Sequence, residues 1–178
     1  MWQRGPRARF LRVDGDGDQM KPKVYVETTI LSYLTALPSR DLVIAAHQQL
    51  TAEWWQGRER FSLFASEVVL AEAARGDPTA AARRLEAAGA MEMLSATPEA
   101  QFLAAALLEA AALPRKAAID AVHVALAAAH GMDFLLTWNC THIANAVIRP
   151  RIEAVCERQG FRPPVICTPE ELVEQEQP

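Results

Sequence analysis

The chain has 178 residues, 51% of them hydrophobic and 22% charged, a balance typical of one globular domain with its own core. A net charge of −4 excludes a protein whose whole surface binds nucleic acid, although a local basic patch is still compatible with it. The three cysteines form no Cys-x-x-Cys pair and so offer no zinc framework. Since no apolar run reaches the roughly 18 residues of a membrane helix, we expect a cytoplasmic protein without membrane contact.

Residues 1–21 are predicted to form a flexible extension, and residues 22–178 a single domain. The extension contains DGDGDQ, which is similar to the start of a calcium-binding loop. A loop beginning at Asp14 would need glycine at its sixth position and glutamate at its twelfth, where the chain has Gln19 and Tyr25. The segment is therefore interpreted as an acidic turn.

From residue 23 onward, short hydrophobic runs alternate with helical patterns. Strands are predicted at 23–27, 61–65, 91–96, 133–138 and 164–167. Helices are predicted at 41–57, 67–74, 78–89, 98–113, 116–129, within 145–159 and at 168–172. Ser66 is the expected N-cap of the second helix, and Thr168 and Glu171 have the spacing of a capping box. This alternation predicts an α/β fold with a parallel sheet covered on both faces.

Polar side chains that can bind a metal follow several of these strands. Glu27 ends the first strand, Glu72 lies in the helix after the second, and Asn139 follows the fourth. Asp120 lies in an otherwise apolar helix, where an ionised carboxylate is costly unless it is paired or binds a metal. Ligands of parallel sheets bind beyond the carboxyl ends of the strands, so we expect these groups to converge. Mg²⁺ and Mn²⁺ prefer such oxygen ligands.

Each of these residues also has an ordinary structural interpretation. Glu27 could face solvent at the end of its strand, and Lys116 could pair with Asp120 one helical turn away. Asn139 could be a turn former. Asp133 begins the fourth strand, at the end away from the expected site, and is interpreted as structural.

The histidines are weaker candidates than the carboxylates. His123 follows Asp120 by three residues, a spacing that di-iron bundles use in two copies, whereas one copy favours a core histidine. His142 comes shortly after Asn139 and could touch substrate at the mouth of the site. Surface positions are expected for the other two histidines, His47 and His130.

Three blocks of the sequence, in this order and spacing, resemble the PIN-domain family and, within it, the VapC-type toxins of toxin–antitoxin pairs. The blocks are VYVETTILSYL, SEVVLAEAARGDP and AAIDAVHVALAAAHGMDFLLTWNCTHIAN. The similarity runs from about Lys23 to Leu172. It implies a three-layer α/β/α sandwich with a short parallel sheet, and a ribonuclease that depends on Mg²⁺ or Mn²⁺.

The resemblance also implies a set of site residues. The catalytic set is Glu27, Glu72, Asp120 and Asn139, and the first three of these are the implied metal ligands. Thr28 and Thr137 would orient the substrate, and the small polar residue that follows the first acid in the family matches either Thr28 or Thr29. The family usually has aspartate as its first acid and another acid in the fourth place, so the chain departs from the pattern at Glu27 and Asn139. Three carboxylates remain, which is enough for one Mg²⁺.

The leading hypothesis is a metal-dependent endoribonuclease that cleaves RNA phosphodiesters, as the toxin of a type II toxin–antitoxin pair. One alternative is a catalytically inert PIN-like binding or regulatory module, and another is a metal-dependent nuclease acting on DNA or structured RNA. The expected partners are RNA, an antitoxin protein and a second copy of the chain in a homodimer. Trp54, Trp55 and the helix 41–57 form a candidate interface. Three arginines could guide an RNA backbone or simply form a solvated helix face: Arg75, Arg83 and Arg84.

Overall fold

The centre of the molecule is a sheet of five parallel strands. The structure, a computed structural model, describes residues 20–172, so most of the predicted N-terminal extension lies outside the described residues. The strands are arranged in the order β3-β2-β1-β4-β5. Their bounds are β1 (Lys23–Val26), β2 (Ser62–Ser66), β3 (Glu92–Leu94), β4 (Phe134–Leu136) and β5 (Val165–Cys167). The α/β class and the parallel sheet predicted from the sequence are confirmed.

The strand order reverses between β1 and β4, which are neighbours in the sheet although two other strands separate them in the sequence. From β1 the chain builds outward through β2 to β3, and it then returns to place β4 on the other side of β1. Val26 is paired with Leu136 at the carboxyl ends of these strands. In open parallel sheets this is the place where ligands bind, because the loops diverge there.

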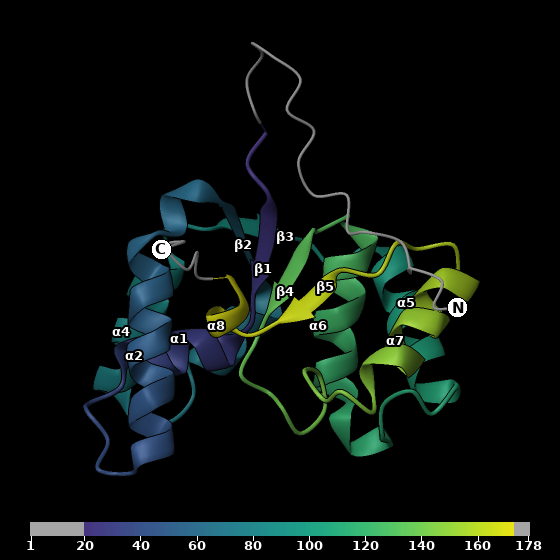
Figure 1. Ribbon diagram of the computed structural model, residues 1–178. Coiled ribbons are helices and arrows are strands. Elements are labelled where there is room, and N and C mark those ends of the chain that lie inside the picture. Colours follow the sequence, from purple (N-terminus) through teal and green to yellow (C-terminus); the bar gives the residue numbers. More distant parts are fainter. Residues whose placement is uncertain (1–19, 173–178) are drawn as a thin grey trace, which may run out of the picture.

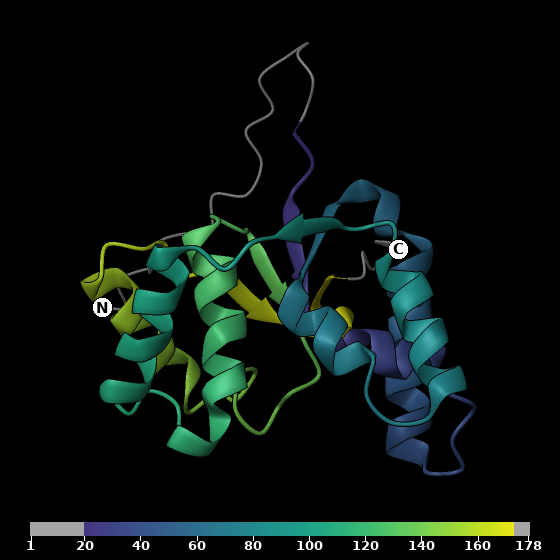
Figure 2. The same ribbon diagram turned by 180° about the vertical axis from the view of Figure 1, so that it is seen from behind.

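Helices cover both faces of the sheet (Figures 1 and 2). One layer contains α1 (Thr28–Thr35), α2 (Leu42–Gln56), α3 (Glu67–Ala73), α4 (Pro78–Ala88) and α8 (Pro169–Leu172). The other contains α5 (Pro98–Glu109), α6 (Ala118–Ala129) and α7 (Arg149–Arg158). Two short 3-10 turns, η1 (Arg58–Arg60) and η2 (Arg115–Ala117), precede β2 and α6. The predicted three-layer sandwich is therefore correct.

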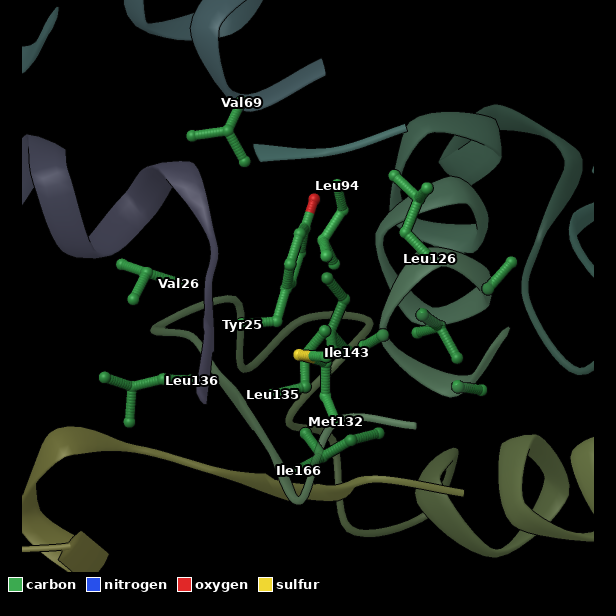
Figure 3. Close-up of a cluster of buried hydrophobic side chains, with 14 of the residues drawn as sticks. Tyr25, Val26, Val69, Leu94, Leu126, Met132, Leu135, Leu136, Ile143 and Ile166 are labelled. Carbon is green, nitrogen blue, oxygen red and sulfur yellow. The ribbon is translucent and has the colours of Figure 1, made fainter. Parts of the chain in front are cut away.

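The core is divided between the two faces of the sheet, because successive side chains of a strand point to opposite sides. Figure 3 shows Tyr25 on the side of Leu126, a residue of α6, and Val26 on the opposite side with Leu136. The helix α6 is apolar nearly all round and lies between α5 and the sheet. A polar residue on its inner face is therefore held in a dry environment.

Three details differ from the prediction. The helix α1 was not predicted, and because it starts at Thr28, Glu27 is its N-cap rather than the last strand residue. The helix predicted at 98–113 ends at Glu109, since Ala111 adopts a positive φ of 51° that no helix continues. The third and fourth strands each have three residues instead of six. Within residues 20–172, every helix is too short or too polar to span a bilayer.

Candidate metal centre

Glu27 is a buried carboxylate, 5% exposed, held by donors from two separate parts of the chain. Its Oε2 accepts hydrogen bonds from the backbone N–H and the hydroxyl of Thr29, the first of which caps α1. The Thr137 hydroxyl, after β4, donates to the same oxygen at 2.7 Å. None of these bonds involves Oε1. One oxygen is thus fixed by the protein while the other remains available to a ligand.

Glu72 is arranged in the same way from the opposite side of the site. Its Oε2 accepts from the Thr28 hydroxyl at 2.6 Å and lies 3.0 Å from Nε2 of His123. The pKa of Glu72 lies below its ordinary value, chiefly because of the hydrogen bond from His123. Burial opposes that shift and the Thr28 hydrogen bond reinforces it. Glu72 is therefore ionised at neutral pH, again with Oε1 outside these hydrogen bonds.

Glu27, Glu72 and His123 form one cluster. Each offers one carboxylate oxygen or ring nitrogen, and these atoms all lie within 4.8 Å of one another. Two carboxylates facing the same small space repel each other unless a cation offsets their charge. Oxygen donors of this kind fit Mg²⁺ or Mn²⁺, which need only a few protein ligands because they keep bound waters. The residues present therefore fit a hard divalent cation.

Asp120 lies in the first turn of α6, beside this cluster rather than within it. Its Oδ1 accepts a hydrogen bond from Nδ2 of Asn139 at 3.0 Å, and its Oδ2 lies 2.8 Å from Nδ1 of His142. The Asn139 Oδ1 accepts from the backbone N–H of His142 at 3.1 Å, which closes the loop on itself. The alternative of an ion pair with Lys116 is not what holds Asp120 in this structure, because His142 is its partner.

The two groups of residues are joined through one hydroxyl. Thr137 Oγ1 donates to Glu27 and also accepts the backbone N–H of Asn139 at 2.9 Å. Asn139 in turn donates to Asp120. A continuous set of hydrogen bonds therefore runs from the carboxylate after β1 to the carboxylate at the start of α6. Four of the six site residues inferred from the sequence belong to this set: Glu27, Thr137, Asn139 and Asp120. The other two, Thr28 and Glu72, are bonded to each other, and Glu72 lies beside Glu27 in the cluster.

Residues 24–139, more than half of the chain, match the family model of the PIN domain. The chain belongs to the PIN-domain family. PIN domains are typically metal-dependent nucleases, which agrees with an acidic cluster at the carboxyl edge of the sheet. Searches of curated proteins and of solved structures returned no significant match.

Both residues that the resemblance offered after the first acid bond to a carboxylate of the cluster: Thr29 supplies both donors from α1 to Glu27, and Thr28 donates to Glu72. One residue was not predicted, namely Tyr25, which lies 2.8 Å from the other ring nitrogen of His123. Tyr25 could have been found, because it precedes Glu27 by two residues and thus shares its face of the extended chain. His123 is a buried core histidine, as expected, but it also contacts Glu72.

The structure also tests the predictions made for one aspartate and two histidines outside the cluster. Asp133 is structural, as predicted, since it accepts the backbone N–H of Lys23 at 2.9 Å. His47 does not project from the surface but stacks on Trp138 with ring centroids 4.0 Å apart. His130 is the C-cap residue of α6. Its ring Nε2 lies 2.8 Å from the carbonyl oxygen of Ser95.

The predicted arginine face and tryptophan interface are only partly available to partners. Arg83 donates to the carbonyl of Thr35, and Arg84 donates to carbonyls at the end of α3, so both brace helices. Trp54 is fully buried and belongs to the core rather than to an interface. Trp55 is only partly buried, with the guanidinium of Arg58 4.7 Å from the ring centroid.

Proposed function

We propose that the chain is a Mg²⁺- or Mn²⁺-dependent endoribonuclease, and that it is the toxin of a type II toxin–antitoxin pair. The observation that carries the nuclease proposal is the pair of carboxylates brought together from the end of β1 and from α3, Glu27 and Glu72, with one oxygen of each outside the hydrogen bonds that hold it. Family membership supports the same reaction class. The RNA preference and the toxin role rest on the resemblance of the sequence to toxins of this kind.

In this proposal Glu27 and Glu72 would hold the cation through their open oxygens, with Asp120, beside the cluster, as the third ligand. A bound Mg²⁺ or Mn²⁺ would supply Lewis acidity toward a phosphodiester. The reaction is hydrolysis: a phosphorus–oxygen bond forms to water, the bond to a ribose oxygen breaks, and that oxygen leaves with a proton from the water. The hydroxyls of Thr28 and Thr137 fix the carboxylates from behind, and Asn139 fixes Asp120.

The direct test is cleavage of a labelled single-stranded RNA with Mn²⁺, Mg²⁺ or EDTA. We expect cleavage with either metal and none in EDTA. Glu27→Gln and Asp120→Asn should each reduce the rate by more than about 100-fold, because each removes a charged ligand that faces the cation. A matched control is His130→Gln, a polar change at the far end of α6. Undiminished cleavage in EDTA would contradict the metal mechanism.

Substrate class is tested with the same preparations. Single-stranded RNA, duplex DNA and a flap substrate are offered at equal concentration, and the proposal requires RNA to be cleaved fastest. Preference for duplex DNA or the flap would instead favour the alternative nuclease. The toxin role predicts that induced expression of the wild-type chain arrests growth and that Asp120→Asn does not.

An inert binding module is the second candidate, and Asn139 is the feature that favours it. An amide in the place of the fourth acid brings no charge to the site. Calorimetric titration separates the two candidates. A dissociation constant in the millimolar range or below for Mn²⁺ supports the nuclease, whereas no detectable binding supports the inert module.

A homodimer and an antitoxin complex remain part of the proposal. With Trp54 in the core, the apolar surface of α2 that is open to a partner consists of Leu42, Val43 and Ile44 near its start. We expect Val43→Glu to shift the protein to monomer in light scattering after size exclusion, with Glu53→Lys on the same helix as the control. A monomeric wild-type protein would contradict the dimer.

A further inference from the structure

A line of hydrogen bonds leads from the interior of the sheet to the candidate metal centre. The Ser66 hydroxyl at the end of β2 lies 2.7 Å from the Tyr25 hydroxyl of β1. That hydroxyl lies 2.8 Å from Nδ1 of His123 in α6, whose Nε2 lies 3.0 Å from Oε2 of Glu72. Tyr25, Ser66 and His123 are each at most 1% exposed. Water therefore does not compete for these bonds.

The hydrogens available determine which group donates and which accepts in each of these hydrogen bonds. Ser66 Oγ already accepts the backbone N–H of Val69, as the N-cap of α3. If the Ser66 hydroxyl donates to Tyr25, then Tyr25 donates to Nδ1 of His123. The neutral ring then carries its hydrogen on Nε2 and donates it to Glu72. Every hydrogen in this arrangement has an acceptor.

The reverse direction leaves buried groups in conflict. If Nδ1 of His123 carried a hydrogen, Tyr25 would accept it and would donate its own hydrogen to Ser66. The Ser66 hydrogen would then have no acceptor among the described residues, at a cost typical of a buried unsatisfied polar group. In a neutral ring, the Nε2 lone pair would also face the carboxylate of Glu72 at 3.0 Å. The first direction is therefore the stable one.

The place of the Tyr25 hydroxyl is fixed by its neighbours, with Ser66 on one side and His123 on the other. The ring reaches from β1 toward the α6 layer, as Figure 3 shows. The donor for Nδ1 of His123 is thus part of the central strand and cannot turn away.

We propose that Tyr25 and His123 are positioning residues: Tyr25 holds His123 as the Nε2–H tautomer, and His123 is thereby a hydrogen-bond donor to Glu72 rather than a ligand of the cation. This rests on the proposed metal-dependent function. The Thr28 hydroxyl donates to the same oxygen, so Oε2 of Glu72 is occupied twice and Oε1 would be the oxygen left for a cation. Such outer partners of metal ligands typically account for about 10- to 100-fold in metal affinity.

The tautomer is read directly by ¹⁵N NMR of the histidine rings in the metal-free wild-type protein at neutral pH. We expect Nε2 of His123 to be protonated and Nδ1 to be unprotonated. Tyr25→Phe, which removes only the hydroxyl, should convert this into a mixture of tautomers. Addition of Zn²⁺, a diamagnetic probe, should leave the hydrogen on Nε2. Loss of that hydrogen on metal addition would overturn the proposal, because His123 would then be a direct ligand.

Calorimetric titration with Mn²⁺ tests the consequence for the site. His123→Leu should weaken binding by about 10-fold or more, and Tyr25→Phe by several-fold. His123→Gln should bind within about 3-fold of the wild type, because its amide N–H can replace the Nε2 donor. The control is His130→Leu at the C-cap of the same helix, which should bind like the wild type.

The outcomes separate this proposal from the function on which it rests. No Mn²⁺ binding by the wild-type protein would contradict the proposed nuclease. Wild-type binding that His123→Leu leaves within 2-fold would overturn the positioning role alone. Circular dichroism of each variant shows whether it folds, and if His123→Leu does not, the NMR result and the contrast between Tyr25→Phe and wild type decide.

Discussion

Each carboxylate of the cluster is held through one oxygen only. Three donors reach Oε2 of Glu27, and two groups reach Oε2 of Glu72. Ligand direction is therefore set before a cation arrives, so little side-chain entropy is lost on binding. Asp120 differs, because both of its oxygens have partners in Asn139 and His142.

The lowered pKa of Glu72 predicts a pH dependence of the metal-free protein. Because the folded state holds this proton less tightly than the unfolded state, the stabilisation is present above the ordinary value of 4.5 and is lost as pH falls through the lower, folded pKa. In urea unfolding with EDTA, the difference in unfolding free energy between wild type and Glu72→Gln should shrink as the solution is acidified. A difference that stays constant from neutral pH to pH 3 would contradict this.

Asn139 explains how an amide can stand where an acid is expected. Its Nδ2 donates to Asp120, whereas an aspartate there would set two negative charges at hydrogen-bond distance. We expect Asn139→Asp to lower the unfolding free energy in EDTA by about 1–3 kcal/mol. The melting temperature should fall accordingly. Mn²⁺ should raise its melting temperature more than that of the wild type, because the cation offsets the added charge.

Differential scanning fluorimetry with and without Mn²⁺ measures both effects. The control is Asn145→Asp, in the same segment, where the side chain bonds only to backbone groups. A metal-induced gain no larger than that of the wild type would show that Asn139 and Asp120 do not face the cation.

At the scale of elements, most boundaries followed from local chemistry. Ser66 caps α3 through Val69, and Glu171 accepts the backbone N–H of Thr168, as the capping signals predicted. The helix α1 was missed because TTILSYLT is rich in β-branched residues, which favour strands locally. Its start depends on the Glu27 side chain, for which the sequence indicated a metal ligand or a solvent-facing strand end but no capping role.

The start of α2 offers a test of such a cap. Asp41 accepts the backbone N–H groups of both Val43 and Ile44 at 3.0 Å. Asp41→Ala should therefore lower the unfolding free energy by about 1 kcal/mol. Glu86→Ala, an exposed carboxylate within α4, should change it by less than about 0.5 kcal/mol. Equal effects of the two changes in urea unfolding would contradict a capping role for Asp41.

At the scale of the molecule, the sheet, its parallel pairing and its two helical layers could be predicted from the alternation of strands and helices. The convergence of Glu27 with Glu72 could also be predicted, because both follow strand ends of one sheet. The hydrogen-bond partners of the individual side chains could not be predicted from the sequence. The bond between His123 and Glu72 spans 51 residues, and no local pattern records it. Neither did a local pattern reveal that Asp120 would be paired with His142.

The position of β1 between β2 and β4 has a consequence for a chain that is still being synthesised. Thr137 binds Glu27 across 110 residues, and β4 completes the central strand's pairing only after the helices α1 to α6 have been made. A nascent chain on the ribosome therefore contains Glu27, Glu72 and Asp120 before it can hold them together. If the protein cleaves RNA as proposed, the newly made chain has its complete site only once synthesis has passed β4.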